Sequence, residues 1–186
     1  MLNKKDGEFL LKLARDVIKK FVKNESIEKP AEYPEALNEK HGVFCTIHKI
    51  INNKKELRGC IGIPYPLISL IDAVISAAKL VCEDPRFPSL KKEELEKIKI
   101  EVSILTEPEL IKVEKPEDYP KKITKEDGLI LEFGPYSGLF LPQVWEQIQD
   151  KEDFLDNLCI KAGLNKGMWK EKGVKIYRFH VQIFEE

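Results

Sequence analysis

Five consecutive residues, Arg58-Gly59-Cys60-Ile61-Gly62, place a cation, a thiol and two glycines within one strand-like segment. In a regular strand, side chains two residues apart point to the same face, so we expect Arg58 and Cys60 to lie side by side. A guanidinium beside a thiol favours the thiolate, which is the nucleophilic form of cysteine. The spacing therefore predicts two candidate catalytic residues: Cys60 as a nucleophile or the acceptor of a modification, and Arg58 as the group that holds an anion.

The same residues also fit a structural interpretation, in which Cys60 is packed and Arg58 is one half of an ion pair. Gly59 and Gly62 weaken a strand and commonly mark a bulge or a close approach of another backbone. They are therefore candidate binding residues, in a surface where shape matters more than the thiol. A cysteine enzyme also needs a base, and His48 on the preceding strand is a candidate. The pairing register that would bring His48 to Cys60 is left open by the sequence.

Two further motifs are candidates for a ligand site. The Asp84-Pro85-Arg86-Phe87-Pro88 loop is stiffened by two prolines, which fix φ and exclude helix. A rigid loop can present Asp84 and Arg86 as binding residues; the alternative is an internal Asp84–Arg86 pair with Phe87 in the core. Gln143 is a candidate binding residue at the predicted start of a helix, where main-chain N–H groups are unpaired. The alternative there is a packing junction.

Motifs for metals and nucleotides are absent from the sequence. The three histidines and the dispersed acids form no metal-ligand pattern, and there is no phosphate-binding glycine loop. No metal site is therefore predicted, and no cofactor is assigned. The four cysteines lie in apolar stretches without zinc-site or CxxC spacing, which predicts reduced thiols at Cys45, Cys60, Cys82 and Cys159.

The charge balance restricts the class of partner. The 186 residues carry a net charge of −1, with a pI near 6.4, and acids flank most of the short lysine runs, which disfavours a nucleic-acid binder.

No stretch is long and apolar enough to span a membrane and no signal peptide is evident, so the expected location is the cytoplasm. Of 31 basic residues only four are arginines, and such a lysine- and glutamate-rich composition is typical of thermophilic proteins.

Hydrophobic periodicity predicts the elements that position these residues. Strands at 43–50 and 56–63, joined by a turn at Asn52-Asn53, form a β-hairpin with the Arg58 motif on its second arm. Because hairpins dominate and strands do not alternate with helices, an α+β fold is favoured over a doubly wound α/β fold. The predicted helices are 6–23 with Asp6 as its cap, 31–39, 67–83, 90–96, 142–149 and one capped by Asp150. The remaining predicted strands are 98–104, 129–133, 138–141 and 174–184, and residues 106–127 are mostly loop.

Together these motifs resemble the AMMECR domain family, whose prokaryotic members are also called AmmeMemoRadiSam system protein A. The resemblance covers nearly the whole chain, and the motifs occur in family order. Its most specific part is LRGCIG at 57–62 combined with DPRFP at 84–88 and GLFLPQV at 138–144. The other matching stretches are GVFCT at 42–46, EVSIL at 101–105, FLDNLCIKAGL at 154–164, Trp169, and the closing strand with Tyr177 and Phe179.

The resemblance implies a single domain over residues 1–186 with two unequal lobes, each an antiparallel sheet with flanking helices. The larger lobe would comprise about 1–105 and 166–186, the smaller lobe about 106–165, and LRGCIG would face a cleft between them. By family association, the expected partners are a Memo-type protein and a radical SAM protein in a shared modification pathway.

Two functions are consistent with these expectations. The first is an enzyme or a component of a modification pathway, which uses residues 57–62 in the cleft on a large substrate such as a protein, with Arg86 as a second contact. The second is a non-catalytic protein-binding module or scaffold, in which the hexapeptide supplies shape. Nucleic-acid binding is a third interpretation, which the charge balance disfavours.

Overall fold

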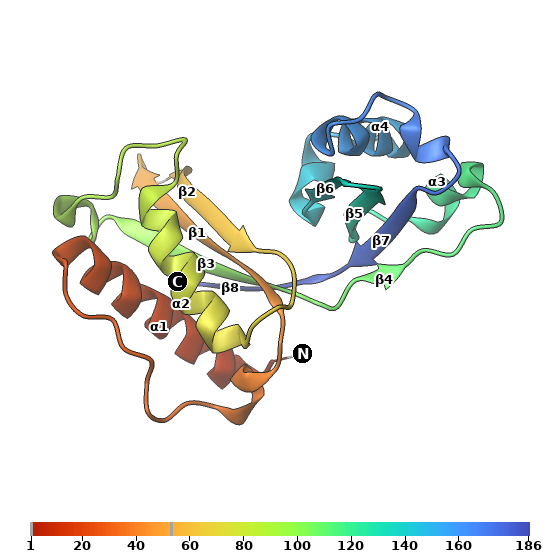
Figure 1. Cartoon of the computed structure of the whole chain (residues 1–186). Helices are drawn as coiled ribbons and strands as arrows, with labels where there is room; N and C mark the ends of the chain where they lie inside the picture. Colours follow the sequence, from red (N-terminus) through yellow and green to blue (C-terminus); the bar gives the residue numbers. More distant parts are fainter. Residues whose placement is uncertain (1, 53) are drawn as a thin grey trace. The chain divides into compact units, whose positions relative to one another are not determined.

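The computed structural model of the chain describes residues 2–52 and 54–186. The chain forms two compact units, one of Met1–Thr106 with Gln182–Glu186 and one of Glu107–Val181 (Figure 1). Each unit contains a four-stranded antiparallel sheet with accompanying helices, which confirms the α+β class. Among the described residues, no helix combines the length and the apolar character needed to cross a membrane.

The first unit is built on a sheet with the strand order β2-β1-β3-β8. The strands are β1 (Gly42–Ile51), β2 (Lys54–Ile63), β3 (Ile98–Leu105) and β8 (Val181–Glu185). The predicted β1–β2 hairpin is confirmed, and Thr46 of β1 pairs with Cys60 of β2 and, on its other side, with Glu101 of β3. Of the predicted turn, Asn52 has a φ of 50° and Asn53 lies outside the described residues.

Two helices, α1 (Lys4–Lys23) and α2 (Leu70–Leu80), pack on one face of this sheet (Figure 1). Their buried side chains share a hydrophobic core with Cys45 and Ile47 of β1. Since side chains alternate along a strand, Thr46 and its partner Cys60 point to the opposite face. The candidate thiol is therefore on the face that neither α1 nor α2 covers.

The start of α1 is fixed by a capping box. The Asn3 side chain accepts a hydrogen bond from the Asp6 N–H, and the Asp6 carboxylate accepts one from the Asn3 N–H. Asn3 is thus the cap, and Asp6, which was expected in that role, is the third residue of the helix. The helix ends at Lys23, and the next residue, Asn24, has a φ of 57°, the left-handed conformation common after a last turn.

The second unit contains a sheet with the strand order β4-β7-β5-β6. Its strands are β4 (Glu109–Leu110), β5 (Gly128–Phe133), β6 (Tyr136–Phe140) and β7 (Lys175–Phe179). Helix α4 (Lys151–Lys161) shares a core with Leu129 and Leu131 of β5. The predicted cap of this helix, Asp150, is confirmed, because its carboxylate accepts the N–H groups of Glu152 and Asp153.

Several predicted elements differ from the observed ones. The expected strand at 174–184 is two strands in different sheets, since β7 pairs with β4 and β5 whereas β8 joins the first sheet. This pairing places residues 166–181 in the second unit and not in the larger lobe.

The helices expected at 31–39, 90–96 and 142–149 are the short 3₁₀ helices η1 (Glu35–Asn38), η3 (Lys92–Glu94) and η5 (Pro142–Glu146). Helix α2 is shorter than 67–83 and continues as η2 (Val81–Glu83), and the expected loop at 106–127 contains β4, η4 (Pro116–Asp118) and α3 (Tyr119–Lys122).

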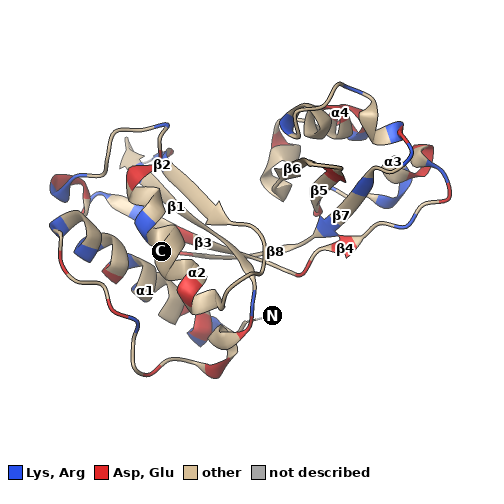
Figure 2. Cartoon of the chain, in the orientation of Figure 1, with Lys and Arg blue, Asp and Glu red and all other residues tan. Residues whose placement is uncertain are grey.

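Basic and acidic residues are interspersed along each unit (Figure 2). On α1, for example, Lys4 pairs with Glu8 and Lys20 with Asp16, each one turn apart. This mixture of signs agrees with the net charge of −1.

Candidate functional site

The hexapeptide motif lies on β2, where it contains a β-bulge. Ile47 pairs with Gly59, whereas the next residue of β1, His48, pairs with Leu57, so Arg58 is an extra residue in β2. A bulge bends the strand and interrupts the alternation of its side chains. The expectation that Arg58 and Cys60 lie side by side assumed a regular strand, and β2 is not regular at this point.

The Arg58 side chain is held by a two-point ion pair with Glu94 of η3. Its Nε and Nη2 donate to the two Glu94 carboxylate oxygens at 2.8 and 3.0 Å, and Nη2 also donates to the Pro88 C=O at 2.8 Å. The Arg58 and Glu94 side chains are only 12% and 17% exposed. The Arg58 hydrogen bonds hold the pKa of Glu94 below its usual range. These contacts favour a structural role for Arg58 and leave its guanidinium poorly placed to hold a ligand.

Asp84 and Arg86 close the free edge of β2 beside the bulge. The Cys60 N–H donates to Asp84 Oδ2 at 2.8 Å, and Arg86 Nη2 donates to the Cys60 C=O at 2.9 Å. Arg86 also binds Asp84 side-on, through Nε to Oδ1 at 3.0 Å and Nη2 to Oδ2 at 2.7 Å. Asp84 is almost completely buried, and the Arg86 hydrogen bonds lower the pKa of its carboxyl to about 2. LRGCIG and DPRFP are thus one structural unit, and we call Asp84, Arg86 and the Cys60 main chain the edge clamp.

The Cys60 thiol is partly buried and interacts with Thr46. Thr46 Oγ1 donates to Cys60 Sγ at 3.3 Å. Burial raises the pKa of the Cys60 thiol, and the opposing effects of the Thr46 hydroxyl and the Arg86 guanidinium do not outweigh it. This balance favours the interpretation of Cys60 as a packed thiol over its interpretation as a thiolate nucleophile. The guanidinium that lowers the pKa of this thiol is that of Arg86.

Gly59 and Gly62 are both required by close packing. A Cβ at Gly59 would lie 2.9 Å from the Val81 carbonyl oxygen of η2, and a Cβ at Gly62 would lie 2.4 Å from the Phe44 ring. A side chain at either position would displace its neighbour. The predicted close approach of other groups is present at both glycines, and it fixes β2 against η2 on one face and against Phe44 on the other.

His48 lies on the same face as Cys60, but it pairs with Leu57 beyond the bulge. In the described part of the chain, the hydrogen bond to the thiol comes from Thr46, and none joins His48 to Cys60. All four cysteines are free thiols; Cys60 is partly buried, and the other three are fully buried. Over residues 2–52 and 54–186, no three side chains are grouped so as to hold a metal ion.

Gln143 lies in η5 of the second unit. Its Oε1 is buried and accepts no hydrogen bond from any described residue. Two residues further on, Trp145 stacks on Phe154 with ring centroids 3.6 Å apart and donates to the Asp127 C=O at 2.9 Å. These contacts favour a packing junction for the segment, and a binding role for Gln143 stays a prediction.

Two residues of the site, Thr46 and Glu94, were missed by sequence reasoning. The position of Thr46 on the first arm of the predicted hairpin is a partial signal. Knowledge of the pairing register would have placed Thr46 opposite Cys60. Glu94 carries none, since it lies 36 residues from Arg58 among several similar acids.

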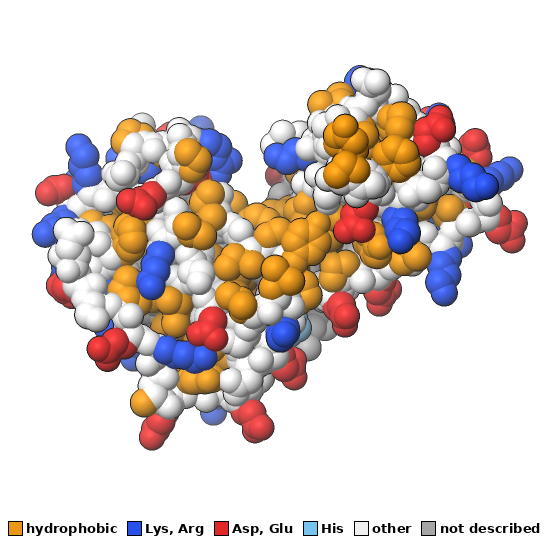
Figure 3. All heavy atoms as spheres, viewed as in Figure 1, with side chains coloured by type: hydrophobic (Ala, Val, Ile, Leu, Met, Phe, Trp, Pro, Cys, Tyr) orange, Lys and Arg blue, Asp and Glu red, His pale blue; other side chains and the backbone are white. Residues whose placement is uncertain are grey.

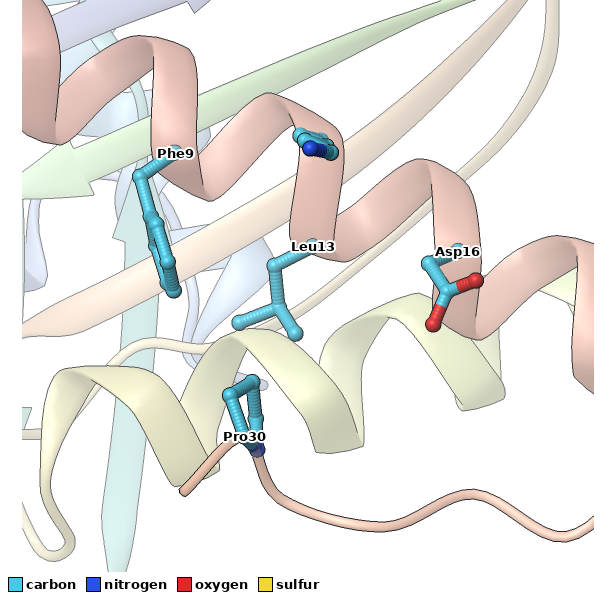
Figure 4. Close-up of a pocket in the computed structure, with 5 residues that line it drawn as sticks. Phe9, Leu13, Asp16 and Pro30 are labelled. Carbon is cyan, nitrogen blue, oxygen red and sulfur yellow. The ribbon is translucent and has the colours of Figure 1, made fainter. Parts of the chain in front are cut away.

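A separate groove of about 200 Å³ lies on the first unit between α1 and Pro30 (Figure 4). Phe9, Leu13 and Pro30 make it mainly apolar, and Lys12 and Asp16 also line it. None of the site residues predicted from the sequence lines this groove. Lys12 and Asp16 are one turn apart on α1, and Asp16 already pairs with Lys20, so the groove offers little for chemistry.

The fold and the site define the class of this chain: it is an α+β protein with two antiparallel sheets, in which one edge strand carries a bulge and the edge clamp. Comparison with known proteins identifies the family. The AMMECR1 family model matches residues 11–184. The chain therefore belongs to the AMMECR1 family, which confirms the resemblance of its motifs. Protein MJ0810 of Methanocaldococcus jannaschii is 51% identical over 100% of this chain and 92% of its own length. Protein PYRAB00100 of Pyrococcus abyssi is 49% identical over 97% of this chain and 90% of its own length.

The fold also matches a solved structure. The crystal structure of protein PH0010 from Pyrococcus horikoshii aligns with a TM-score of 0.90 at 45% identity, and the alignment covers 100% of this chain and 93% of that one. These relatives come from thermophilic archaea, in agreement with the lysine- and glutamate-rich composition. Their names state no activity, so membership of the family establishes the fold, and the function has to be inferred from the site.

Proposed function

We propose that the chain is a protein-binding module whose contact surface is the Cys60 face of the first sheet. The observation that carries this proposal is that the polar groups of both motifs are already paired within the chain. Arg58 is bound to Glu94, and Asp84 is bound to Arg86 and to the Cys60 N–H. Because the pKa of the Cys60 thiol is raised as well, the motif offers a rigid shape and not an acid–base pair.

The Cys60 face has the character of a protein-binding surface. Three of its apolar side chains stay accessible: Ile50 is 40% exposed, Leu57 45% and Ile183 46%. Ile183 belongs to this face because the adjacent Phe184 packs toward Gly7 of α1. Ile50 and Leu57 lie near one another at the same end of the β1–β2 hairpin, where neighbouring accessible apolar side chains are typical of a binding surface, whereas Ile183 on β8 lies apart from them. The bulge and the edge clamp hold β2 rigid, which reduces the entropy lost when a partner binds.

The family association supports a Memo-type protein or a radical SAM protein as the partner. Isothermal titration calorimetry with each of these proteins from the same organism tests the proposal. We expect Leu57→Ser to weaken binding of the partner about tenfold, because it removes an accessible apolar contact. Ile160→Ser is the matched control, since Ile160 is 49% exposed on α4 of the second unit.

The two variants separate the outcomes. Loss of affinity in Leu57→Ser alone supports the Cys60 face as the contact surface. Equal affinities of Leu57→Ser and the wild type would place the contact elsewhere, and a wild-type chain that binds neither protein would contradict the proposed partners. Circular dichroism on each variant shows whether it is folded.

Covalent chemistry at Cys60 is a second candidate function. The hydrogen bond from Thr46 and the nearby Arg86 guanidinium favour it, because both lower the pKa of the thiol against the effect of burial. In this case Cys60 is the nucleophile or acceptor in a modification of a large substrate such as a protein. Complementation of a deletion strain separates the two functions: a binding module tolerates Cys60→Ser and Cys60→Ala, whereas a covalent mechanism loses function in both.

A further inference from the structure

We infer that Glu101 of β3 receives a basic side chain of the protein that binds the Cys60 face; this inference rests on the proposed function. Glu101 belongs to the EVSIL stretch at 101–105, to which the edge clamp assigns no role. It pairs with Thr46, and Thr46 pairs on its other side with Cys60. The three residues therefore form one row across β3, β1 and β2, and this row adds a carboxylate to the candidate site.

The Glu101 carboxylate lies on the same face as the Cys60 thiol. Directly opposite residues of neighbouring antiparallel strands direct their side chains to one face, and the contact of Thr46 Oγ1 with Cys60 Sγ at 3.3 Å identifies that face. The charge of Glu101 also acts on the thiol: burial is the main cause of the raised pKa of Cys60, and the Glu101 carboxylate contributes to it. The strand register and the electrostatics of the thiol thus both place Glu101 beside the motif.

The Glu101 carboxylate is oriented by its own strand but has no cation as a partner. Ser103 is 2% exposed, and its Oγ donates to Glu101 Oε1 at 3.0 Å. Glu101 is itself partly buried, yet among the described residues no lysine or arginine lies within ion-pair distance of it. Asp84 and Glu94, the other two carboxylates of the site, are each bound by an arginine. Since a carboxylate that loses hydration is stabilised by a cation, the position is suited to a positive group from outside the chain.

The neighbouring row of side chains favours a lysine or arginine side chain over a metal ion. His48 pairs with Leu57 on one side and Lys99 on the other, so these residues form the next row, about 7 Å further along the strands. Leu57 is 45% exposed. Basic side chains bury their CH₂ stems against apolar surface and keep the charged head at a polar group, as a carboxylate beside an accessible leucine allows. In the described part of the chain, no three side chains are grouped to hold a metal ion.

The surrounding charges make Glu101 itself the source of attraction for a cation. Lys99 is on the same face but exposed, so water and salt screen its charge from Glu101. On the surface of the first unit that Figure 3 shows, basic and acidic side chains are interspersed. A broad potential of one sign is therefore not expected there. Removal of this one carboxylate should be enough to abolish the site.

The test uses nuclear magnetic resonance on the full chain, with N-acetyl-arginine amide as the probe. We expect the probe to shift the backbone amide signals of Thr46, Cys60 and Glu101 in a saturable manner. Glu101→Gln should weaken this binding at least about tenfold. Glu56→Gln, which removes an exposed carboxylate of β2, is the matched control and should change it less than about twofold. N-acetyl-citrulline amide has the same shape without the charge and should cause no saturable shift.

Several outcomes overturn the inference. Equal affinity in the wild type and Glu101→Gln does so, as does the absence of saturable shifts in the wild type up to about 50 mM probe. Equal losses in Glu101→Gln and Glu56→Gln would show unspecific attraction, which also contradicts the site. If Mg²⁺ causes the same Glu101-dependent shifts as the probe, the occupant is a metal ion and the inference fails.

The variant and the probe keep this test separate from that of the proposed function. Glu101→Gln should fold normally, because glutamine has the same size and still accepts the Ser103 hydrogen bond. Glu101→Ala is a second variant with the same expected direction. Since the probe requires no partner protein, failure of the Glu101 site alongside an intact effect of Leu57→Ser on partner binding overturns this inference alone.

Discussion

Arg58 and Glu94 form a two-point ion pair at 2.8 and 3.0 Å between residues that are 36 positions apart in the sequence. The pair ties the bulge of β2 to η3, and a hydrogen bond from Arg58 to Pro88 adds the intervening loop. A guanidinium bound in this way contributes geometry that a lysine cannot reproduce. The guanidinium that stays accessible belongs to Arg86, whose side chain is 55% exposed.

Removal of Arg58 should destabilise the first unit. We expect Arg58→Ala to lower the free energy of unfolding by about 3 kcal/mol, because it leaves the largely buried Glu94 carboxylate without its partner. Urea denaturation measures the change. In the exposed Lys170–Glu152 pair, Lys170→Ala should change stability by less than about 0.5 kcal/mol. Similar losses in the two variants would contradict the structural role assigned to Arg58.

Asp84 should make the fold sensitive to acid. Its pKa is about 2 in the folded chain against an ordinary value of 3.8, so the ionised carboxylate stabilises the fold above pH 3.8. That contribution, about 2 kcal/mol, is lost as the pH falls through this window toward 2. Asp84→Asn should remove this contribution to stability. Unfolding curves at a series of acidic pH values measure the difference from the wild type. The pKa of Glu94 is also lowered, so the unfolding free energy of Asp84→Asn should still fall somewhat as the pH falls. An unchanged pH dependence in Asp84→Asn is the result that would count against the edge clamp.

Gly59 should tolerate no side chain. Gly59→Ala places a Cβ 2.9 Å from the Val81 carbonyl oxygen, and we expect a loss of about 2 kcal/mol in unfolding free energy as η2 is displaced. Cys60→Ser, at the next position, is the control and should cost less than about 1 kcal/mol. Chemical denaturation of the two variants compares them. If Gly59→Ala is as stable as the wild type, η2 can shift without cost and the glycine is not a packing requirement.

Cys60 should be accessible but not activated. We expect iodoacetamide to label Cys60 faster than Cys45, Cys82 and Cys159, because the other three are buried. The labelling midpoint should lie above the value of about 8.5 for a free thiol, since burial raises the pKa of Cys60. Mass spectrometry over a pH series measures this midpoint. Thr46→Val should raise the midpoint further by removing the hydroxyl donor, and a wild-type midpoint below about 8.5 would favour the covalent function instead.

Features governed by neighbouring residues were predictable from the sequence. The β1–β2 hairpin follows from two apolar runs around an Asn-containing turn, and the Asp150 cap follows from an acceptor placed before a helical pattern. The close approaches at Gly59 and Gly62 were also anticipated, because a glycine inside a strand commonly marks a place where another group comes near the backbone.

Features set by distant partners were not predictable in the same way. The position of the bulge at Arg58 depends on the register with β1, and the ion pair depends on Glu94. The segment at 174–184 has strand-forming residues throughout, but which sheet each half joins is decided by β5 and β3 and not by its own pattern. The sign of the Cys60 pKa shift depends on burial, which residue spacing does not reveal.

The edge clamp has one more consequence, for behaviour at high concentration. β2 is the outermost strand of its sheet and contains the uncharged run Cys60-Ile61-Gly62-Ile63. Unprotected strands of this kind pair with strands of other molecules and start aggregation. Because Asp84 and Arg86 already occupy the N–H and C=O of Cys60, an incoming strand finds no hydrogen-bonding groups at that residue. The ion pair that shapes the candidate site thus also blocks strand addition at Cys60.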